Sequence, residues 1–517
     1  MNSKPHSFEA DPEQLVSDFL TEFSERGAYA RDHVTRLAEL AAADDEQVAE
    51  PATRAFFRSL VERLADSFDP AAVSLYNKAF AQLIQTSRRA KRGRLLDQRL
   101  TEFGLITEDH LLARADRLRS SWERRHPCLP AVDHTQHAGS VRSGLSRVIV
   151  LSRVTLGADV AITSVMLERF KQIFPNAEIV LVGGRKASEL FAGDSRITFK
   201  EIGYPRGATA IDRLLAWLPL LDCVRELAGG VDECLIVDPD SRLTQLGLLP
   251  LTDDDARDEH NRSSGRRYAN GGVRYLFFPS REYGHDSSAS LSELSSAWLD
   301  EVFGVSQVSY PYVSPSRADL DAARSLVKRL NHDARPIVTI NFGVGENPSK
   351  RVGEKFEREL VSSLLSDGAT IVLDKGAGTG EAQRAESVIA FARQASSKSL
   401  QTIEVDEGNL PKLLGADRLE AELLVWSGRV GLLAALIGES DLYIGYDSAG
   451  QHIAAAFGVP CVDVFAGFSS RRMLDRWRPT GKGETRVIVE PAVSADTILA
   501  ETLRHARGLL AQRRHER

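Results

Sequence analysis

The sequence predicts a mixed α/β protein in which two doubly wound, Rossmann-like domains follow an all-helical N-terminal domain. Apolar residues recur at helical spacing, without strand-like alternation, up to about residue 125. From residue 147, short apolar strands alternate with helical patterns, which is typical of parallel sheets covered on both faces. The alternation begins again near residue 335. We therefore expect a helical domain at 1–125, a linker at 126–146, Rossmann-like domains at 147–330 and 335–490, and a C-terminal helix at 491–517.

Composition excludes several classes of protein. The 517 residues include 65 Lys and Arg against 72 Asp and Glu, a formal charge of −7, which makes the chain a poor candidate for a general nucleic-acid binder. Four scattered cysteines without a CxxC pair argue against a disulfide framework and a clustered zinc site, and they suit a reducing cytosol. The N-terminus has no apolar signal core, and no run of 18 apolar residues occurs, so we expect a cytoplasmic protein.

The first 125 residues carry the helical signal most clearly at Phe57, Leu60, Val61 and Leu64, which share one helix face. Pro51 and Pro70 are predicted helix boundaries. The basic run at 88–94 has two interpretations, contact with an anionic membrane surface or phosphate-bearing partner, and a solvated helix face or interhelix turn. We expect at most peripheral membrane contact.

The first Rossmann-like domain begins with a β-α-β unit, whose strands are expected at 147–152 and 177–182. Further strands are expected at 197–202, 233–237 and 274–278, and a linker between the two domains near 314–333.

The second series should place ligands at the carboxyl ends of its strands, facing a cleft between the domains. Ser494 is expected to cap the last helix. The predicted strands are 336–341, 370–373, 441–445 and 461–465, and the predicted helices are 356–365, 382–393, 450–457 and 494–510.

A strand that runs into an alanine-rich helix forms the most informative segment, at 440–467. The first amides of that helix would bind an anion such as a diphosphate, assisted by the helix dipole. Ser448 would add a hydroxyl donor, and Gly450 would allow close approach of the backbone. Alternatively, Asp447 and Ser448 only cap a helix of small, core-packing residues.

The stretch YDSAGQHIAAAFGVP resembles the signature of glycosyltransferase family 9, the ADP-heptose:lipopolysaccharide heptosyltransferase group. His452 follows Asp447 by five residues, as in the family, and Ala449 replaces a family glycine. The resemblance, which extends over about 147–491, implies a GT-B fold. It also implies that Asp447, Ser448, Ala449, Gly450 and His452 bind the diphosphate and sugar of a nucleotide-sugar donor.

A second stretch, VIVLSRVTLGADVAITS, resembles the first β-α-β unit of this family, whose catalytic base is the aspartate of a Gly-Asp pair. Here Ala158 is inserted between Gly157 and Asp159, and the downstream match aligns Asp159 with that base. Inversion at an anomeric carbon requires a carboxylate to deprotonate the acceptor hydroxyl. The alternative is that Asp159 caps the helix.

A third stretch, VTINFGVGENPSKRVGEKF, resembles the start of the family's second domain. Lys350 matches its phosphate-neutralising lysine, with Arg351 beside it, and Gly343 and Gly345 would let backbone amides approach the donor. Cationic groups of this kind stabilise a diphosphate leaving group without a metal. The alternative is that Lys350 is an ordinary surface lysine.

The acceptor side is expected after the strand at 233–237. Asp240, Ser241 and Arg242 are candidate acceptor contacts, and the alternative is a metal held by Asp238 and Asp240. His134 and His137 could ligate a metal only with further ligands. A polar cluster could serve the acceptor or form a solvated loop, and it consists of Arg281, Glu282, Tyr283 and His285.

These patterns together predict an inverting, metal-independent, heptosyltransferase-like glycosyltransferase. It would move a sugar from a nucleotide-diphospho sugar to a hydroxyl of a glycan, lipid-linked or protein acceptor, as in the synthesis of bacterial cell-surface glycans. No cofactor is expected besides the nucleotide-sugar substrate. The alternatives are a nucleotide-sugar epimerase of similar fold and a non-catalytic binding or scaffold protein with a degenerate transferase core.

Overall fold

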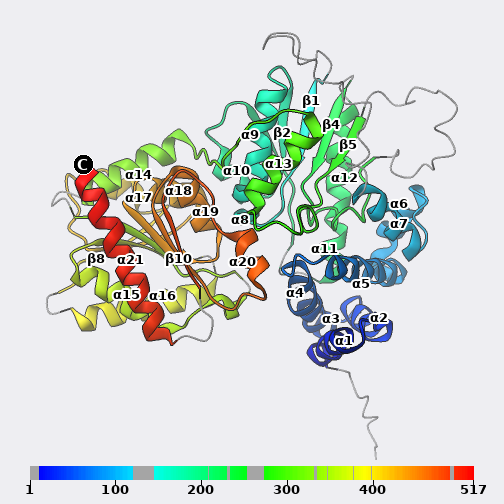
Figure 1. Cartoon of the computed structure of the whole chain (residues 1–517), viewed down its shortest axis with the longest axis horizontal. Helices are drawn as coiled ribbons and strands as arrows, with labels where there is room; N and C mark the ends of the chain where they lie inside the picture. The colour runs from blue at the N-terminus through cyan, green and yellow to red at the C-terminus, as the bar shows by residue number, and fades with distance from the viewer. Residues whose placement is uncertain are drawn as a thin grey trace, which may run out of the picture. The chain divides into compact units, whose positions relative to one another are not determined.

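The computed structural model describes residues 11–119, 145–205, 207, 209–229, 233–252, 273–330, 335–345, 347–376, 378–396, 399–489 and 494–516 (Figure 1). His134 and His137 lie outside these ranges. None of the helices described is long and apolar enough to cross a membrane.

The N-terminal domain is helical, as predicted. The predicted face of Phe57, Leu60, Val61 and Leu64 is buried. Pro70 begins α5, and the Asp69 side chain caps that helix by accepting from the Ala71 amide at 2.9 Å. The elements are α1(Pro12–Arg26), α2(Arg31–Ala41), α3(Glu46–Arg54), the π-helix η1(Ala55–Val61), α4(Glu62–Ala65), α5(Pro70–Arg89), η2(Lys91–Gly93), α6(Arg94–Glu102) and α7(Glu108–Arg119).

The predicted helix boundary at Pro51 is wrong. Pro51 lies inside α3, which runs directly into the π-helix η1. A proline inside a helix costs about 3 kcal/mol, because it removes one hydrogen bond and crowds the preceding turn. The helix continues because Ala52, Ala55 and Phe56 are fully buried on its core face.

The basic run is only partly a solvated surface. Arg88 is 6% exposed, forms an ion pair with Asp97, and donates to the backbone carbonyls of Leu105 and Ile106 at 2.7 and 3.0 Å. Arg88 therefore closes the loop between α6 and α7 and is not available to an anionic surface.

The first sheet has the strand order β3-β2-β1-β4-β5, and the pairs β1–β4, β2–β3 and β4–β5 are parallel. Its strands are β1(Arg147–Leu151), β2(Glu178–Gly183), β3(Ile197–Glu201), β4(Cys234–Asp238) and β5(Val273–Phe277). Its helices are α8(Leu156–Ala158), the π-helix η3(Asp159–Thr163), α9(Ser164–Ile173), α10(Arg185–Phe191), α11(Ala210–Leu215), α12(Trp217–Gly229) and α13(Leu291–Phe303).

The second sheet is parallel throughout, in the order β12-β11-β10-β6-β7-β9-β8. Its strands are β6(Ile337–Asn341), β7(Thr370–Asp374), β8(Thr402–Asp406), β9(Leu423–Ser427), β10(Leu442–Tyr446), β11(Cys461–Phe465) and β12(Thr485–Val489). Its helices are α14(Arg317–Leu330), η6(Pro348–Lys350), α15(Glu354–Ser366), α16(Thr379–Ala395), α17(Leu410–Leu414), α18(Val430–Gly438), α19(Ala449–Phe457), α20(Arg471–Trp477) and α21(Ala495–Glu516).

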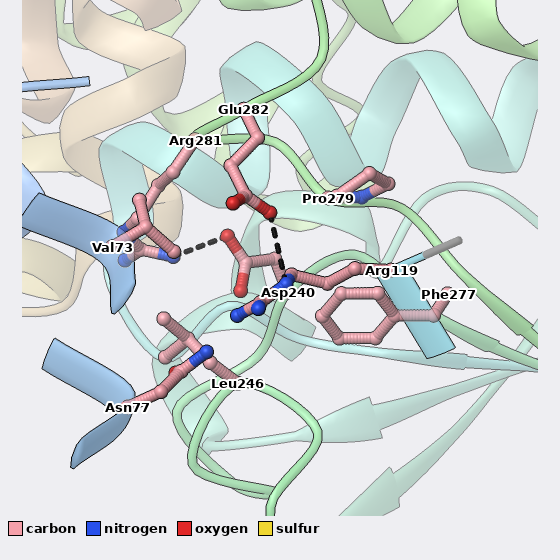
Figure 2. A pocket seen from close by; sticks show the side chains of 9 residues that line it. All are labelled: Val73, Asn77, Arg119, Asp240, Leu246, Phe277, Pro279, Arg281 and Glu282. Atoms are coloured by element: carbon pink, nitrogen blue, oxygen red, sulfur yellow. Dashed lines mark hydrogen bonds and ion pairs between the residues drawn. The ribbon is translucent and has the colours of Figure 1, made fainter. Parts of the chain in front are cut away.

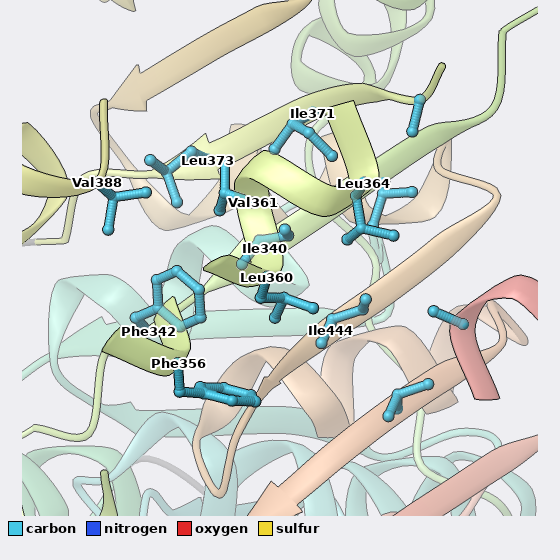
Figure 3. Packing of buried hydrophobic residues seen from close by; sticks show 14 of the residues in the cluster. Ile340, Phe342, Phe356, Leu360, Val361, Leu364, Ile371, Leu373, Val388 and Ile444 are labelled. Carbon is cyan, nitrogen blue, oxygen red and sulfur yellow. The ribbon is translucent and has the colours of Figure 1, made fainter. Parts of the chain in front are cut away.

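The core of this second domain lies between the sheet and helices α15, α16 and α21. Figure 3 shows Ile340 and Ile444 of the sheet packed with Leu360 of α15. Alternate residues of each strand face the opposite side, where α19 contacts β10 and β11. That second face carries the polar residues Tyr443 and Asp463, so it is the face on which a polar binding site can form.

The prediction of two doubly wound parallel sheets that follow an N-terminal helical region along the chain is thus confirmed. The linker expected near 314–333 is wrong, because most of it forms the amphipathic helix α14, which packs against α18. Three strands, β8, β9 and β12, were not predicted. Ser494 caps α21 as predicted, accepting from the Thr497 amide at 3.3 Å.

The chain divides into two compact units, and each is described by itself. One holds the helical domain with β1, β4 and β5. The other holds β2, β3, the helices α8 to α10, α13 and the whole second sheet.

Candidate active site

The turn after β1 is organised around Asp159. Its carboxylate accepts hydrogen bonds from the Ser152 hydroxyl at 2.7 Å, the Arg153 amide at 2.8 Å and the Thr163 hydroxyl at 3.0 Å. The turn is strained, since Val154 has a φ of 75°, which is rare for a β-branched residue. Asp159 is therefore the centre of a preorganised loop.

Asp159 is not a helix cap. The N-cap position of α8 is occupied by Thr155. Asp159 accepts a hydrogen bond from the backbone amide of Arg153, which lies before the helix, whereas a cap accepts from an amide of the first helical turn. Asp159 is only 1% exposed, and burial raises the pKa of its carboxyl above the ordinary value, although its three hydrogen bonds act in the opposite direction. A carboxylate with a raised pKa is a stronger base than one in water.

The start of α19 brings together two residues predicted from separate segments. Lys350, at the end of η6, donates to Oδ2 of Asp447 at 2.6 Å, and Gln451 donates to Oδ1 at 3.0 Å. The side chains of Lys350 and Asp447 are 18% and 7% exposed. Lys350 is therefore a half-buried cation held at the first turn of a helix, and not an ordinary surface lysine.

His452 is buried on the first turn of α19, beside the ring of Trp477 at 6.1 Å between centroids. The pKa of His452 is lowered to about 4, chiefly by burial; the charge of Asp447 acts to raise it, and the charge of Lys350 acts to lower it. The imidazole is therefore neutral at pH 7, and it can bind a sugar hydroxyl as donor or acceptor but does not supply a positive charge.

The Asp159 loop contacts the start of α19 directly, within one compact unit. A methyl group at Gly157 would come within 3.3 Å of Cδ2 of His452 and 3.6 Å of Cα of Ala449. A glycine is favoured at this point because the two segments approach so closely. The predicted base and the predicted donor-binding segment are thus neighbours.

Several buried polar atoms near the start of α19 have no hydrogen-bond partner within the described part of the chain. They are Oε1 of Gln451, Nδ1 of His452 and both carboxyl oxygens of Asp463. Asp463 lies on β11 opposite Gly445 of β10 and is fully buried. Burial, and then the negative charge of Asp447, raises the pKa of Asp463 well above its ordinary value, against the effect of Lys350. Unpaired buried groups are costly and rare, so their clustering indicates bound water or a polar ligand.

Other predicted donor contacts have structural partners. Arg351 forms a bidentate pair with the buried Glu357, at 2.8 and 2.7 Å, and Glu357 also accepts from Tyr446 at 3.1 Å. At Gly450, a methyl group would fall 2.1 Å from the Tyr443 hydroxyl, so this glycine makes room for a tyrosine.

The remaining donor-side predictions fall at the ends of β6 and β10. The Gly343 amide donates to the Asn341 side chain at 2.7 Å, and Gly345 has a φ of 62°, which favours glycine. Ser448 precedes α19 without capping it by a side-chain hydrogen bond. Its hydroxyl faces that of Tyr443, and the contact acts to lower the tyrosine pKa, although burial raises it overall.

On the predicted acceptor side, Asp238 and Asp240 are occupied by protein donors. Asp238 accepts from the Ser241 amide, Thr244 and Tyr275 at 2.6, 2.5 and 2.6 Å, and burial raises its pKa to about 6. Asp240 forms an ion pair with Arg281. Over the ranges that the structure covers, no group of three or more His, Cys, Asp or Glu residues could hold a metal ion.

Arg242 points toward the helical domain. Burial acts to lower its pKa, but the neighbouring Tyr76, Tyr204, Glu62 and Asp66 raise it. A solvated loop was one interpretation of the segment that holds Arg281 and Glu282. These two side chains are instead fixed by ion pairs, Arg281 with Asp240 and Glu282 with Arg119 at 3.2 Å. No local sequence signal could have given these pairings, which join segments far apart in the chain.

No protein-family model and no curated protein matches the chain. Among solved structures, it is similar to a glycosyltransferase family 9 protein from Veillonella parvula DSM 2008, with a TM-score of 0.49 and 15% identity over 72% of this chain and 99% of that one. It is also similar to E. coli ADP-heptose lipopolysaccharide heptosyltransferase II, with a TM-score of 0.44 and 14% identity over 71% and 99%. A third similar structure is E. coli heptosyltransferase WaaC with ADP, with a TM-score of 0.44 and 14% identity over 69% of this chain and 99% of that one. Similarities at this level assign neither an activity nor a substrate to the chain.

Proposed function

We propose that this protein is an inverting glycosyltransferase of the heptosyltransferase type, which moves a sugar from a nucleotide-diphospho sugar to a hydroxyl acceptor without a metal ion. The observation that supports the proposal best is the contact between two polar centres. The Asp159 loop lies against the first turn of α19, where the Lys350–Asp447 pair and several unpaired buried atoms gather.

The chemistry assigns one role to each centre. The acceptor hydroxyl loses its proton to Asp159 as its oxygen forms a bond to the anomeric carbon. The bond from that carbon to the diphosphate oxygen breaks on the opposite face, and the nucleoside diphosphate leaves with the electron pair. Lys350 and the first amides of α19 stabilise the leaving charge. A carboxylate has about four lone-pair sites, so three bonded donors leave Asp159 one site for the incoming hydroxyl.

We also propose a cytoplasmic location. Cys234 and Cys461 are buried, free thiols. Free thiols persist in reducing compartments.

The test is a panel of ADP-, UDP- and GDP-sugars in a thermal unfolding experiment. A donor at 100 times its dissociation constant stabilises the folded protein by about 2.7 kcal/mol. Stabilisation by one donor, followed by release of its nucleoside diphosphate, supports the proposal. Interconversion of the sugar without an acceptor would indicate an epimerase, and binding without turnover a non-catalytic protein.

Replacing Lys350 by Ala is expected to weaken binding of that donor about tenfold, because the cation facing the diphosphate is lost. Titration by calorimetry measures it. Lys355→Ala is the matched control, since Lys355 is an exposed lysine of α15 that pairs with Asp496. Equal affinities for the two variants would remove Lys350 from the site.

Treatment with EDTA is expected to leave sugar transfer unchanged, because Lys350 and the helix amides supply the positive charge that a metal would otherwise provide. The measurement is the initial rate of nucleoside diphosphate release before and after dialysis against EDTA. Loss of activity that Mg²⁺ or Mn²⁺ restores would instead favour a metal at Asp238 and Asp240.

A further inference from the structure

A small pocket lies where the helical domain meets the loops that follow β4 and β5. Helix α5 contributes Val73 and Asn77, the end of α7 contributes Arg119, and the loops contribute Asp240, Arg281 and Glu282 (Figure 2). All of these residues belong to the same compact unit. The pocket therefore opens at the carboxyl ends of two parallel strands, which is where ligands bind in such sheets.

We propose that this pocket is a subsite for the acceptor, in which the helical domain recognises one neutral hydroxyl group through Asn77 and Arg119. The proposal rests on the proposed glycosyl transfer and extends it to acceptor specificity. It assigns a function to a domain that lies outside the residues for which a family resemblance was found.

Two unpaired atoms give the pocket its chemical preference. Asn77 is 2% exposed, and its Oδ1 atom has no hydrogen-bond partner among the residues that the structure describes; Nη1 of Arg119 is likewise buried without one. Both side chains line the pocket. One atom is an acceptor and the other a donor, and a hydroxyl group, like a water molecule, satisfies both at once.

The charges in the pocket are already balanced. Asp240 pairs with Arg281, and Glu282 pairs with Arg119 at 3.2 Å, as the dashed lines in Figure 2 show. An additional anion or cation would have to break one of these pairs in a mostly buried setting. A neutral group is therefore favoured over a carboxylate, a phosphate or an amine.

The size of the pocket agrees with a single group. Its volume is about 10 Å³, which is space for about one water molecule or one hydroxyl. The adjoining loop has a strained backbone, with Asp240 and Leu246 at φ values of 64° and 56°. Such conformations persist only where the surrounding structure holds them in place. The buried side-chain amide of Gln245 in that loop also has no hydrogen-bond partner in the described ranges. The subsite is thus preformed.

The experiment uses the full-length protein and saturation-transfer NMR. The probes are methyl β-glucoside, methyl β-galactoside and methyl α-mannoside, with glucuronate and glucose 6-phosphate as charged analogues. We expect at least one neutral sugar to bind, and Asn77→Leu to weaken it about tenfold. Gln98→Leu is the control, because Gln98 is an exposed residue of the same domain whose side chain donates to Glu102 at 3.3 Å, away from the pocket lining.

Folding is checked on the same samples. Leucine leaves no unpaired amide, so the melting temperature of Asn77→Leu should be unchanged or higher. Arg119→Lys is the second variant, because it keeps a positive charge near Glu282 and removes the guanidinium atom. Arg119→Lys should weaken sugar binding about as much as Asn77→Leu. If Asn77→Leu does not fold, the sugar affinity of Arg119→Lys tests the proposed subsite instead.

Three results would overturn the proposal: no neutral sugar binds, a charged analogue binds more tightly, or Asn77→Leu and Gln98→Leu behave alike. Donor binding, measured separately, distinguishes the two levels of inference. If a nucleotide sugar still binds, only the acceptor subsite is rejected, whereas absence of donor binding rejects the proposed function.

Discussion

Replacing Asp159 by Asn is expected to lower turnover by about 10²–10⁴-fold, because the general base is lost. This corresponds to about 3–5 kcal/mol in the activation free energy. The fold should survive, since the asparagine oxygen can still accept from the Arg153 amide and Thr163, and its NH₂ group can donate to the Ser152 hydroxyl. Donor affinity should be nearly unchanged. The rate of nucleoside diphosphate release, compared with the donor dissociation constant, measures both effects.

Thr163→Val is the matched control for this prediction. It removes one donor to the Asp159 carboxylate and leaves the carboxylate in place. We expect a lower melting temperature and a small effect on turnover. If Asp159→Asn lowers the melting temperature and spares turnover in the same way, Asp159 only holds the loop together, and the base must be sought elsewhere, with Asp240 the next candidate.

Asp463→Asn is expected to stabilise the protein increasingly as the pH rises. The folded state raises the pKa of Asp463 above its ordinary value, so the folded protein keeps a proton that the unfolded chain releases. The free energy of unfolding therefore falls as the pH rises from about 4, the ordinary range of an aspartate, to the raised pKa. Each unit of upward shift costs about 1.4 kcal/mol. Asparagine has no such proton to lose.

The measurement is the difference in melting temperature between the variant and the wild type from pH 4.5 to pH 8. It should be smallest at pH 4.5 and should then grow in favour of the variant. Asp496→Asn, at an exposed carboxylate of α21, should show no such growth. A difference that stays constant, or that shrinks with pH, would mean that Asp463 is ionised and paired in the folded protein.

The central strands could be predicted from the sequence because strands buried on both faces are continuously apolar. Thus β11 was predicted with the bounds Cys461–Phe465 that the structure shows. The two edge strands, β8 and β12, carry polar residues on their exposed sides, and they lack that signal. The signal for β9 was present in Leu423–Ser427, which is an apolar run, and could have been used.

The candidate site was predictable only where one segment holds several of its residues. The Asp447–His452 stretch and the Asp159 loop are of this kind. The partner of Arg351 could not be predicted. Its guanidinium pairs with Glu357 of the next helix rather than facing the donor, and no sequence pattern distinguishes these two possibilities. The same holds for Asp240 and Arg281, which only the packing of two loops brings together.

The π-helix η3 explains how the chain absorbs a change in length beside its proposed base. The resemblance implies that Ala158 is an inserted residue, and the turn that begins at Asp159 is a π-helical turn, wider than an α-helical one. A π-helical turn holds one residue more than an α-helical turn, so the extra residue is taken up locally and α9 continues in its normal register. An insertion at this point therefore leaves both anchors of the segment, β1 and α9, where the rest of the domain requires them. Chains with the uninterrupted Gly-Asp pair should need only an ordinary α-helical turn here.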